Sequence, residues 1–373
     1  MNLTLLSFSS TLFSGLSFVR RSRVDIYQCQ LSKVLGISFY SFMTSRLSLK
    51  RSWVDQALSS VVFVANCDKV NGMAYTTNKV FNSALKCVEI MDCTFSQISL
   101  PNIAGVCTVS DSQTKMNVTH CLFYECRKGA ECSGVFSSGK DLLVSMCCFS
   151  NMDNVHISGS NGGTAICGHL NTQTIMMDNS VNNIGGAHSP LHFYQTSSIF
   201  KNNNVTDSIT ISSITYTTGV LYISSTYVEC DHNHFARCLN GNTFYPYYSA
   251  SFTATRLFFI NCTCPSGSGI LYFIYGSCGI IDSVFINNSP NILHGQSQTY
   301  TFTNCIFSTS NILCNPAGIA NPVNCQFFTN IIPDRVNNVN TLFCVGQPQE
   351  TLHHGRLRHN FLLSTVIFIL KIH

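Results

Sequence analysis

The feature that most constrains the fold is a small residue followed two positions later by phenylalanine, which recurs along most of the chain. Residues two apart in a β-strand point to the same face of a sheet, so each unit sends a small side chain and an aromatic ring into one interior. The units, the last two of them looser, are Cys93/Phe95, Cys121/Phe123, Cys147/Phe149, Ser198/Phe200, Ser283/Phe285, Cys305/Phe307, Cys325/Phe327, Asn233/Phe235 and Leu257/Phe259.

Glycine followed by a short apolar stretch forms a second unit, as in Gly134-Val135 and Gly219-Val220, and the two units alternate along the chain. Where consecutive units are clear, the spacing between phenylalanines runs from 20 to 28 residues. At about 3.3 Å per strand residue, this length supplies three short strands and three turns. We therefore predict an all-β fold, a single-stranded right-handed parallel β-helix (solenoid) of about 20–28 residues per coil. The handedness follows from the general preference of parallel crossovers.

The polar residues of the chain support an all-β fold. Charged residues make up only 10 % of the sequence, against about 25 % in an ordinary soluble domain, so Asn, Ser and Thr must build the surface. These residues suit turns and stacked strands, whereas a helical bundle needs Glu, Lys and Ala on its solvent side. A leucine-rich repeat would need an L-x-x-L-x-L frame, which is absent, and a propeller would need blades of about forty residues.

The motif F-x-x-N alternates with glycine-rich apolar segments such as residues 162–166, and occurs at Phe63–Asn66, Phe200–Asn203, Phe285–Asn288 and Phe327–Asn330. This alternation resembles the FxxN/GGAI repeat of polymorphic outer-membrane proteins, as in chlamydial and trichomonad surface families. The resemblance covers about residues 63–330 and implies a right-handed parallel β-helix, exposure at the cell surface and adhesion. The chain departs from the family where Cys126, Cys238 and Cys262 replace asparagine, and a perfect G-G-A-I segment is missing.

The chain contains 20 cysteines, none of them in a C-x-x-C pair. The lack of such pairs disfavours zinc ribbons and thioredoxin-type redox sites. Two interpretations are left open by the sequence: disulfides formed in an oxidising compartment, or buried thiols packed as small hydrophobic side chains.

The sequence divides into four segments. Residues 1–20 form an apolar signal-like or signal-anchor segment, and residues 21–60 a basic N-terminal cap. Residues 61–345 carry the repeats of the parallel β-helix, and residues 346–373 form a basic tail with a short apolar C-terminus. The apolar run at 361–370 has ten residues, about half of the ~20 that a spanning helix needs. We expect any membrane association to involve these termini.

Basic residues concentrate at the two ends of the chain. Between residues 52 and 349, eleven basic residues stand against fifteen acidic ones. This mildly acidic body argues against a nucleic-acid groove.

Two sets of residues are candidates for modification and for the structural core. Four Asn-x-Ser/Thr sequons in the body of the chain agree with secretion and are glycosylation candidates: Asn117, Asn204, Asn261 and Asn287. The predicted structural ladder consists of Phe95, Phe123, Phe149, Phe200, Phe235, Phe259, Phe285, Phe307 and Phe327 with Cys93, Cys121, Cys147, Cys305 and Cys325.

Parallel β-helices also include polysaccharide lyases and hydrolases, and such chemistry needs converging carboxylates or an acidic cluster beside a base. Asp92, Asp178 and Asp282 recur just before the small-x-Phe unit, where we expect a solvated row at a turn. His232 and His234 would share one face of a strand, a spacing that can hold a metal, and the alternative is a polar loop. No catalytic or nucleotide-binding motif is found, so we predict no catalytic residue, metal site or cofactor.

Residues 244–248 are rich in aromatic side chains and break the rhythm of the coils. We expect a repacked insertion there, with a surface loop that offers its rings to a sugar or protein partner as the alternative.

These observations predict a non-catalytic β-helix protein at the cell surface or outside the cell, in adhesion or interaction with a host or matrix. Its partner would be a host or extracellular protein or a glycan, and not nucleic acid. Two alternatives are a polysaccharide-acting β-helix enzyme and a truncated, non-functional member of a family.

Overall fold

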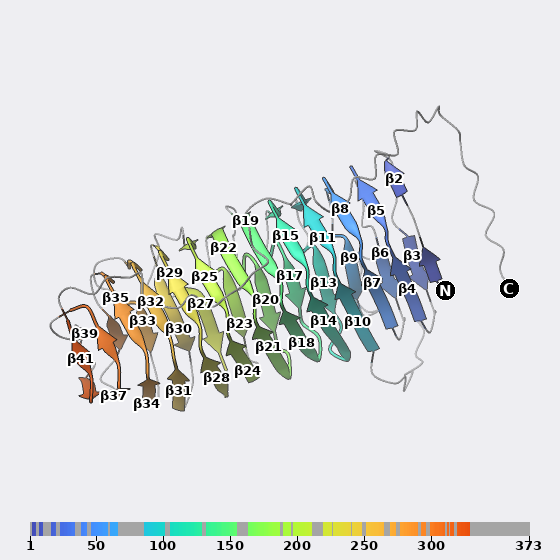
Figure 1. The fold of residues 1–373 in the computed structure, drawn as a ribbon. Helices are drawn as coiled ribbons and strands as arrows, with labels where there is room; N and C mark the ends of the chain where they lie inside the picture. Colours follow the sequence, from blue (N-terminus) through green and yellow to red (C-terminus); the bar gives the residue numbers. More distant parts are fainter. Residues whose placement is uncertain are drawn as a thin grey trace, which may run out of the picture.

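The computed structural model describes residues 2–4, 7–9, 16–19, 23–33, 39–42, 46–58, 60–65, 86–100, 105–128, 132–154, 163–186, 189–194, 197–210, 219–225, 227–239, 241–247, 251–264, 269–273, 277–289, 292–295, 299–309, 312, 314–316 and 319–328. Over these residues the chain forms an elongated stack of coils, with the first strands at one end and the last at the other (Figure 1). Successive strands belong in turn to three long sheets, which we name A, B and C.

Sheet A has 13 strands, sheet B has 16 and sheet C has 12. Sheet A contains β1 (Asn2–Thr4), β4 (Arg23–Tyr27), β7 (Arg46–Lys50), β10 (Lys86–Met91), β14 (Thr114–Thr119), β18 (Asp141–Ser145), β21 (Gln173–Met177), β24 (Ser197–Lys201), β28 (Val228–Asp231), β31 (Ser251–Thr255), β34 (Ser277–Ile281), β37 (Thr299–Thr303) and β40 (Ile319–Val323). Sheet B contains β2 (Ser7–Ser9), β5 (Gln30–Ser32), β8 (Trp53–Asp55), β11 (Thr94–Ser96), β15 (Leu122–Tyr124), β19 (Cys148–Asn154), β22 (Ser180–Gly186), β25 (Asn204–Thr206), β29 (His234–Ala236), β32 (Phe258–Ile260), β35 (Val284–Ile286), β38 (Ile306–Phe307) and β41 (Gln326–Phe327), with β12 (Ser99–Leu100), β16 (Arg127–Lys128) and β26 (Ile209–Thr210) beside this path. Sheet C contains β3 (Leu16–Val19), β6 (Phe39–Phe42), β9 (Val62–Ala65), β13 (Cys107–Ser110), β17 (Val135–Ser137), β20 (Ile166–His169), β23 (Leu191–Tyr194), β27 (Gly219–Ser224), β30 (Asn242–Tyr247), β33 (Leu271–Phe273), β36 (Leu293–Gly295) and β39 (Cys314–Pro316).

The strand pairing confirms the predicted all-β parallel solenoid. Neighbouring strands of each sheet are parallel, as in the pairs β10–β14, β11–β15 and β13–β17. The described residues contain no helix. Nine coils span the stretch from Phe95 to Phe327, about 26 residues each. Individual coils run from 20 residues (Phe307 to Phe327) to 32 residues (Phe149 to Val181), slightly beyond the predicted range.

The alternation of apolar and polar residues decides which side chains enter the interior. In β14, Met116 and Val118 are buried, whereas Lys115 and Asn117 lie on the outer face. This period of two is expected for a sheet with one dry face and one solvated face. Each parallel strand repeats the pattern of its neighbour, so the apolar side chains of successive coils meet in one continuous core.

Single residues in the left-handed region form two corners of most coils. A first-corner residue joins a sheet A strand to a sheet B strand, and these residues are Gln28, Arg51, Asp92, His120, Met146, Asp178, Asn202, His232, Arg256, Asp282, Asn304 and Asn324. A second-corner residue follows the sheet B strand or, in the longer strands β19 and β22, lies within it. These residues are Lys33, Gln56, Gln97, Glu125, Asn151, Asn183, Asp207, Arg237, Asn261 and Asn287. A non-glycine residue in this region costs about 1–3 kcal/mol.

Hydrogen bonds to the next coil hold these corners in place. At the first corner, the N–H of Asp92 donates to the carbonyl of Thr119 at 3.1 Å. At the second corner, the N–H of Gln97 donates to the carbonyl of Tyr124 at 2.9 Å. Each corner thereby turns its amide along the axis of the solenoid, and the bond offsets the strain of the backbone.

The inward position of sheet B carries a stack of apolar side chains, most of them phenylalanine rings, that we name the Phe column. It consists of Leu31, Val54, Phe95, Phe123, Phe149, Val181, Val205, Phe235, Phe259, Phe285, Phe307 and Phe327. Consecutive rings are nearly parallel, as for Phe123 and Phe149, whose centroids lie 4.8 Å apart at 7°. This distance matches the spacing of neighbouring strands, so the register of the sheet sets the stacking.

One predicted member of the ladder lies elsewhere. Phe200 belongs to β24 of sheet A, where it aligns with Met176 and Cys230. The place of this coil in the Phe column is taken by Val205. Phe200 is still buried and packs near Phe235, with ring centroids 6.3 Å apart. The sequence motif S-x-F therefore marks an inward-facing pair of a strand but does not identify the sheet.

The three sheets begin before the predicted start of the β-helix at residue 61. Strands β1 to β9 pair in order with the strands that follow them, so residues 21–60 continue the same stack. A signal or anchor role for residues 1–20 stays a prediction. The last described strand is β41, and the predicted tail at 346–373 lies outside the described residues.

Sheet A ends, in the described part of the chain, on a strand that contains proline. The carbonyl of Val323 accepts the N–H of Asn304 from the preceding coil at 2.9 Å. Successive residues of a strand direct their backbone groups to opposite sides, so Pro322 faces the open edge of β40. Proline has no N–H to donate there.

We predict that Phe123→Ala lowers the free energy of unfolding by about 3–5 kcal/mol, because it opens a cavity in the Phe column. Phe328, which is 47 % exposed, supplies the matched control, and Phe328→Ala should change stability far less. Chemical denaturation followed by circular dichroism measures both. Equal losses for the two variants would contradict the buried stack.

Candidate functional site

The residue after each first-corner residue points into the core, and together these residues form the first-corner column. It consists of Cys29, Ser52, Cys93, Cys121, Cys147, Asn179, Asn203, Asn233, Leu257, Ser283, Cys305 and Cys325. All are buried except Cys325, which is half-buried. The five cysteines of the predicted ladder all lie in this column.

Most thiols of the column pack against backbone carbonyl groups. The Sγ atom of Cys93 lies 3.1 Å from the carbonyl oxygen of Met91 and 3.4 Å from that of Leu49. Burial raises the pKa of the Cys93 and Cys121 thiols well above the ordinary value, and that of Cys305 to about 12. A thiolate is the reactive form of cysteine, so these groups are poor nucleophiles and poor metal ligands.

The structure favours packed thiols over disulfides for most cysteines. Sixteen cysteines of the described residues keep their thiols outside any disulfide, and Cys148 is disulfide-bonded. Fourteen of these sixteen cysteines are buried. These thiols therefore give no argument for an oxidising compartment.

Asparagines continue the first-corner column where the cysteines stop. Asn179 Nδ2 donates to Asn203 Oδ1, and Asn203 Nδ2 donates to Asn233 Oδ1, both at 3.0 Å. Asn233 Nδ2 closes the series by donating to the carbonyl of Phe200 at 2.8 Å. No local motif predicts this ladder as a unit, although Asn179 and Asn203 each follow a polar corner residue just before a strand.

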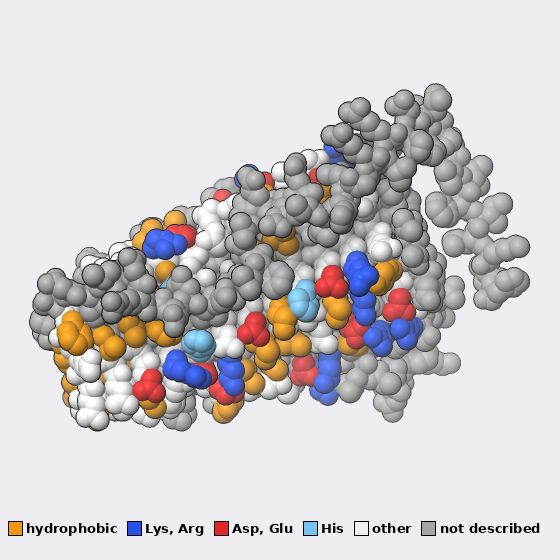
Figure 2. Space-filling model, in the orientation of Figure 1, with side chains coloured by type: hydrophobic (Ala, Val, Ile, Leu, Met, Phe, Trp, Pro, Cys, Tyr) orange, Lys and Arg blue, Asp and Glu red, His pale blue; other side chains and the backbone are white. Residues whose placement is uncertain are grey.

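Pairs of opposite charge cross the strands on the outer face of sheet A. Figure 2 shows basic and acidic side chains beside one another along this side of the molecule. Arg46 lies 2.7 Å from Glu89, and Lys115 lies 2.8 Å from Asp141. Exposed pairs of this kind contribute little to stability, so their main effect is to balance charge over the face.

Asp231 ends one of these strands and is held by two neighbours in the next coil. Thr255 Oγ1 donates to Asp231 Oδ1 at 2.5 Å, and Arg256 Nε donates to the same oxygen at 2.9 Å. Burial alone would raise the pKa of Asp231, but these contacts outweigh it and lower the pKa.

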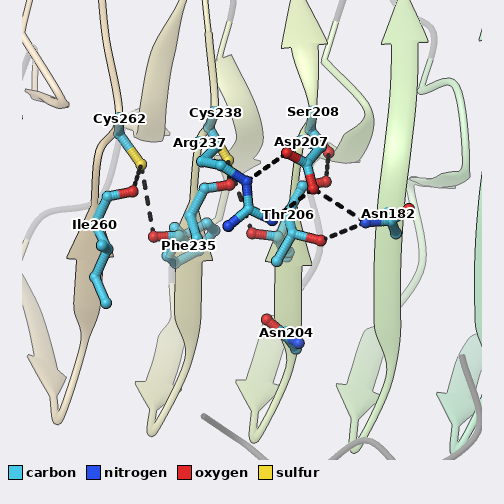
Figure 3. Close-up of polar contacts among 12 residues, drawn as sticks. Asn182, Asn204, Thr206, Asp207, Ser208, Phe235, Arg237, Cys238, Ile260 and Cys262 are labelled. Carbon is cyan, nitrogen blue, oxygen red and sulfur yellow. Dashed lines mark hydrogen bonds and ion pairs between the residues drawn. The ribbon is translucent and has the colours of Figure 1, made fainter. Parts of the chain in front are cut away.

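The second corner carries the polar cluster drawn in Figure 3, where Arg237 reaches back to Asp207 across two neighbouring coils. Arg237 Nε and Nη2 donate to the two oxygens of Asp207 at 2.6 and 2.7 Å. Asn182 Nδ2 donates to Thr206 Oγ1 at 2.7 Å and to Asp207 at 3.2 Å. The guanidinium of Arg237 lowers the pKa of Asp207 below the ordinary value of an aspartate. The carboxylate therefore stays ionised at pH values at which an ordinary aspartate begins to be protonated.

The histidine pair does not lie as predicted. His232 is a first-corner residue with a φ of 52°, which interrupts the strand, whereas His234 belongs to β29. Each Nδ1 contacts an asparagine of the preceding coil, Asn202 at 3.0 Å and Asn204 at 2.7 Å. An amide oxygen only accepts, so His234 donates from Nδ1, and burial lowers its pKa to about 4.

The described carboxylates are spread along the solenoid, and several of them accept a hydrogen bond from a residue of a neighbouring coil. Asp178 accepts from Asn202 Nδ2 at 3.1 Å, and Asp282 accepts from Asn304 Nδ2 at 3.1 Å. Asp92 lies 3.9 Å from His120. Together with the ion pairs above, these contacts tie acidic residues to neighbouring coils. Among the described residues, no group of three or more His, Cys, Asp or Glu could hold a metal ion.

The aromatic stretch at 244–248 is part of the regular fold up to Tyr247. It lies in β30 of sheet C, where Phe244 and Tyr245 are buried. Tyr245 contacts Tyr272, with ring centroids 4.6 Å apart. The surface-loop alternative is therefore wrong for Phe244 and Tyr245, because a core strand holds their rings.

The four sequons fall into two structural classes. Asn117 lies in β14 and Asn204 in β25, and both side chains are half-buried. Asn261 and Asn287 are exposed second-corner residues.

No family model matches the chain, and neither curated proteins nor solved structures yield a significant match. In the described residues, no helix has the length and apolar character that crossing a membrane requires.

We predict that Asn203→Ala lowers the free energy of unfolding by several kcal/mol. The change removes the acceptor of the backbone N–H of Asn179, which donates to Asn203 Oδ1 at 3.1 Å. It also removes the side-chain donor to the carbonyl of Met176. Each buried group left without a partner costs about 1–3 kcal/mol. Chemical denaturation measures the effect, and Asn321→Ala on the exposed face of β40 is the control. A loss no larger than that of Asn321→Ala would rule out a stabilising ladder.

We predict that the ion pair of Asp207 makes stability depend on acid pH. Its pKa is lowered in the folded state, so the contribution is complete above the unfolded value of about 3.9. It disappears as the pH falls through the lowered folded value. The stability difference between the native chain and Asp207→Asn should therefore shrink below about pH 4. In an Arg237→Gln background the same comparison should show a much weaker pH dependence, and an unchanged dependence would refute the assignment.

Proposed function

We propose that this chain is a non-catalytic binding module, displayed at the cell surface or outside the cell, that presents the outer face of sheet A to a macromolecular partner. The observation that carries the proposal is the length of this face. Thirteen parallel strands form it, and at about 4.8 Å between strands it extends over about 58 Å. A flat face of this length suits a protein or a glycan chain, whereas small ligands bind in concave pockets.

The chemistry of the face changes along the axis. Ion pairs occupy much of it, from β7 to β28, whose Asp231 pairs with the corner residue Arg256. Its last third carries hydroxyl groups from Thr253, Thr255, Ser277, Thr299, Thr301 and Thr303. Hydroxyls donate and accept hydrogen bonds at little desolvation cost, which suits the hydroxyl groups of a glycan or the polar surface of a protein. We place the contact in this hydroxyl-rich third.

The resemblance to polymorphic outer-membrane proteins supports a role in adhesion. The motif at Phe285–Asn288 has a clear structural part in this chain. Asn288 is buried directly after a second-corner residue, where its Oδ1 accepts from the N–H of Cys262 and its Nδ2 donates to the carbonyl of Phe259, both at 2.9 Å. A motif that joins successive coils in this way leaves the outer faces free to vary with the partner.

We predict that the purified chain binds a component of a panel of extracellular-matrix proteins and arrayed glycans. Thr253→Arg and Thr299→Arg should each weaken this binding by about tenfold or more, equivalent to about 1.4 kcal/mol, because both side chains are exposed on the proposed face. Gln97→Arg, exposed at the second corner, is the matched control and should bind normally. Binding that responds to Gln97→Arg and not to the two threonine variants would refute the face.

Location is tested separately. Antibody against the folded chain should label intact, unpermeabilised cells or the culture medium. Labelling that appears only after permeabilisation would overturn the extracellular part of the proposal.

A further inference from the structure

We propose that the second corner carries an N-linked glycan at Asn261 or Asn287, and that the two sequons on strands, Asn117 and Asn204, stay unmodified in the folded chain. The biological relevance of this inference rests on the proposed extracellular function. The assignment itself comes from the places that the four asparagines occupy in the solenoid.

Corner geometry opens Asn261 and Asn287 to an enzyme. Both residues have a left-handed backbone, with φ of 52° and 51°, and both are exposed. Their backbone groups are already used, since the N–H of Asn261 donates to the carbonyl of Ile286 at 2.9 Å and the N–H of Asn287 to Ser308 Oγ at 2.7 Å. Modification of the side chain would disturb neither bond.

The neighbouring corner residue leaves this space open. Arg237 precedes Asn261 in the column of second-corner residues, but its guanidinium reaches the other way, to Asp207 (Figure 3). The residues that follow each asparagine, Cys262 and Asn288, point into the core. A sugar on the corner side chain would therefore extend away from the packed interior.

The other two sequons, at Asn117 and Asn204, lie on strands, where neighbouring side chains hinder glycosylation. Asn204 is half-buried, and its Oδ1 holds the Nδ1 of His234 at 2.7 Å. His234 is only 4 % exposed, so a glycan on Nδ2 of Asn204 would stand directly beside a packed, buried ring. Asn117 stands in the middle of β14, aligned with Glu89 on one side and Leu143 on the other. Strands about 4.8 Å apart crowd a bulky group from both sides.

The chemistry is a group transfer from a lipid-diphosphate-linked oligosaccharide. The side-chain nitrogen Nδ2 forms a bond to C1 of the first sugar, the bond between C1 and the phosphate oxygen breaks, and the lipid diphosphate leaves. One amide proton is released to solvent. Asn261 and Asn287 occupy consecutive coils, about 4.8 Å apart along the axis, so a glycan on one hinders transfer to the other. We expect one glycan per chain.

The test uses the full chain secreted from eukaryotic cells behind a general signal peptide, which makes it independent of the chain's own N-terminus. Peptide-N-glycosidase removes the glycan and converts the modified asparagine to aspartate, so digestion in heavy-oxygen water maps the site by mass spectrometry. We expect Asn261 or Asn287 to be labelled in the secreted, folded fraction. Label at Asn204 or Asn117, or at no site, would overturn the proposal.

Variants separate the two corner sites. Thr263→Ala and Ser289→Ala each remove one sequon without touching its corner asparagine, and each single variant should keep one glycan on the remaining site. The double variant should lose the mobility shift entirely while keeping the circular dichroism of the native chain. A shift that persists in the double variant would contradict the assignment. Failure of the native N-terminus to direct secretion would count against the proposed function alone.

Discussion

Hydrogen bonds that run from one coil to the next are the constraint on which the rest of the structure depends. They include the sheet ladders and the amides of corner residues such as Asp92 and Gln97, which donate to carbonyls one coil further on. A parallel register of this kind stacks each residue on the corresponding residue of the next coil. A column of such residues therefore excludes water only if every coil supplies a side chain that fits. The Phe column and the first-corner column are the two results, and both follow from the turn of the backbone at the corners.

The first-corner column shows how different side chains meet one requirement. Each must fill a small space, and most of the polar members also engage the backbone of the preceding coil, whereas Leu257 only packs in the core. Cys121 does so through Sγ, 3.7 Å from the carbonyl oxygen of Ile90, and Asn203 through Nδ2, 3.0 Å from that of Met176. Ser283 accepts instead, from the N–H of Leu257 at 2.9 Å. A thiol, an amide and a hydroxyl are thus exchangeable inside, which leaves selection free to act on the outer faces.

Sequence spacing predicted the solenoid because stacked coils repeat a local pattern, and the C-x-F units led directly to sheet B. Spacing could not distinguish a strand of sheet A from a strand of sheet B, because a small residue and a phenylalanine two positions apart both face the core in either sheet. Phe200 was assigned to the Phe column for this reason, although it lies in sheet A. The Asn179–Asn203 ladder and the Asp207–Arg237 pair join residues 24 and 30 positions apart, so no local motif reveals them. The state of the cysteines depended on burial, which a list of positions does not contain.

Pro322 affects how readily one molecule of this kind could pair its strand edge with another at high concentration. A solenoid is built by adding strands to an open edge, and nothing in that process distinguishes the next segment of the same chain from a segment of another molecule. Among the described residues β40 is the last strand of sheet A, and because Pro322 has no N–H to donate, a foreign strand that paired with it there would form an incomplete ladder. The architecture that makes the stack extensible thus carries, at the last described strand of sheet A, a residue that opposes the pairing of a foreign strand.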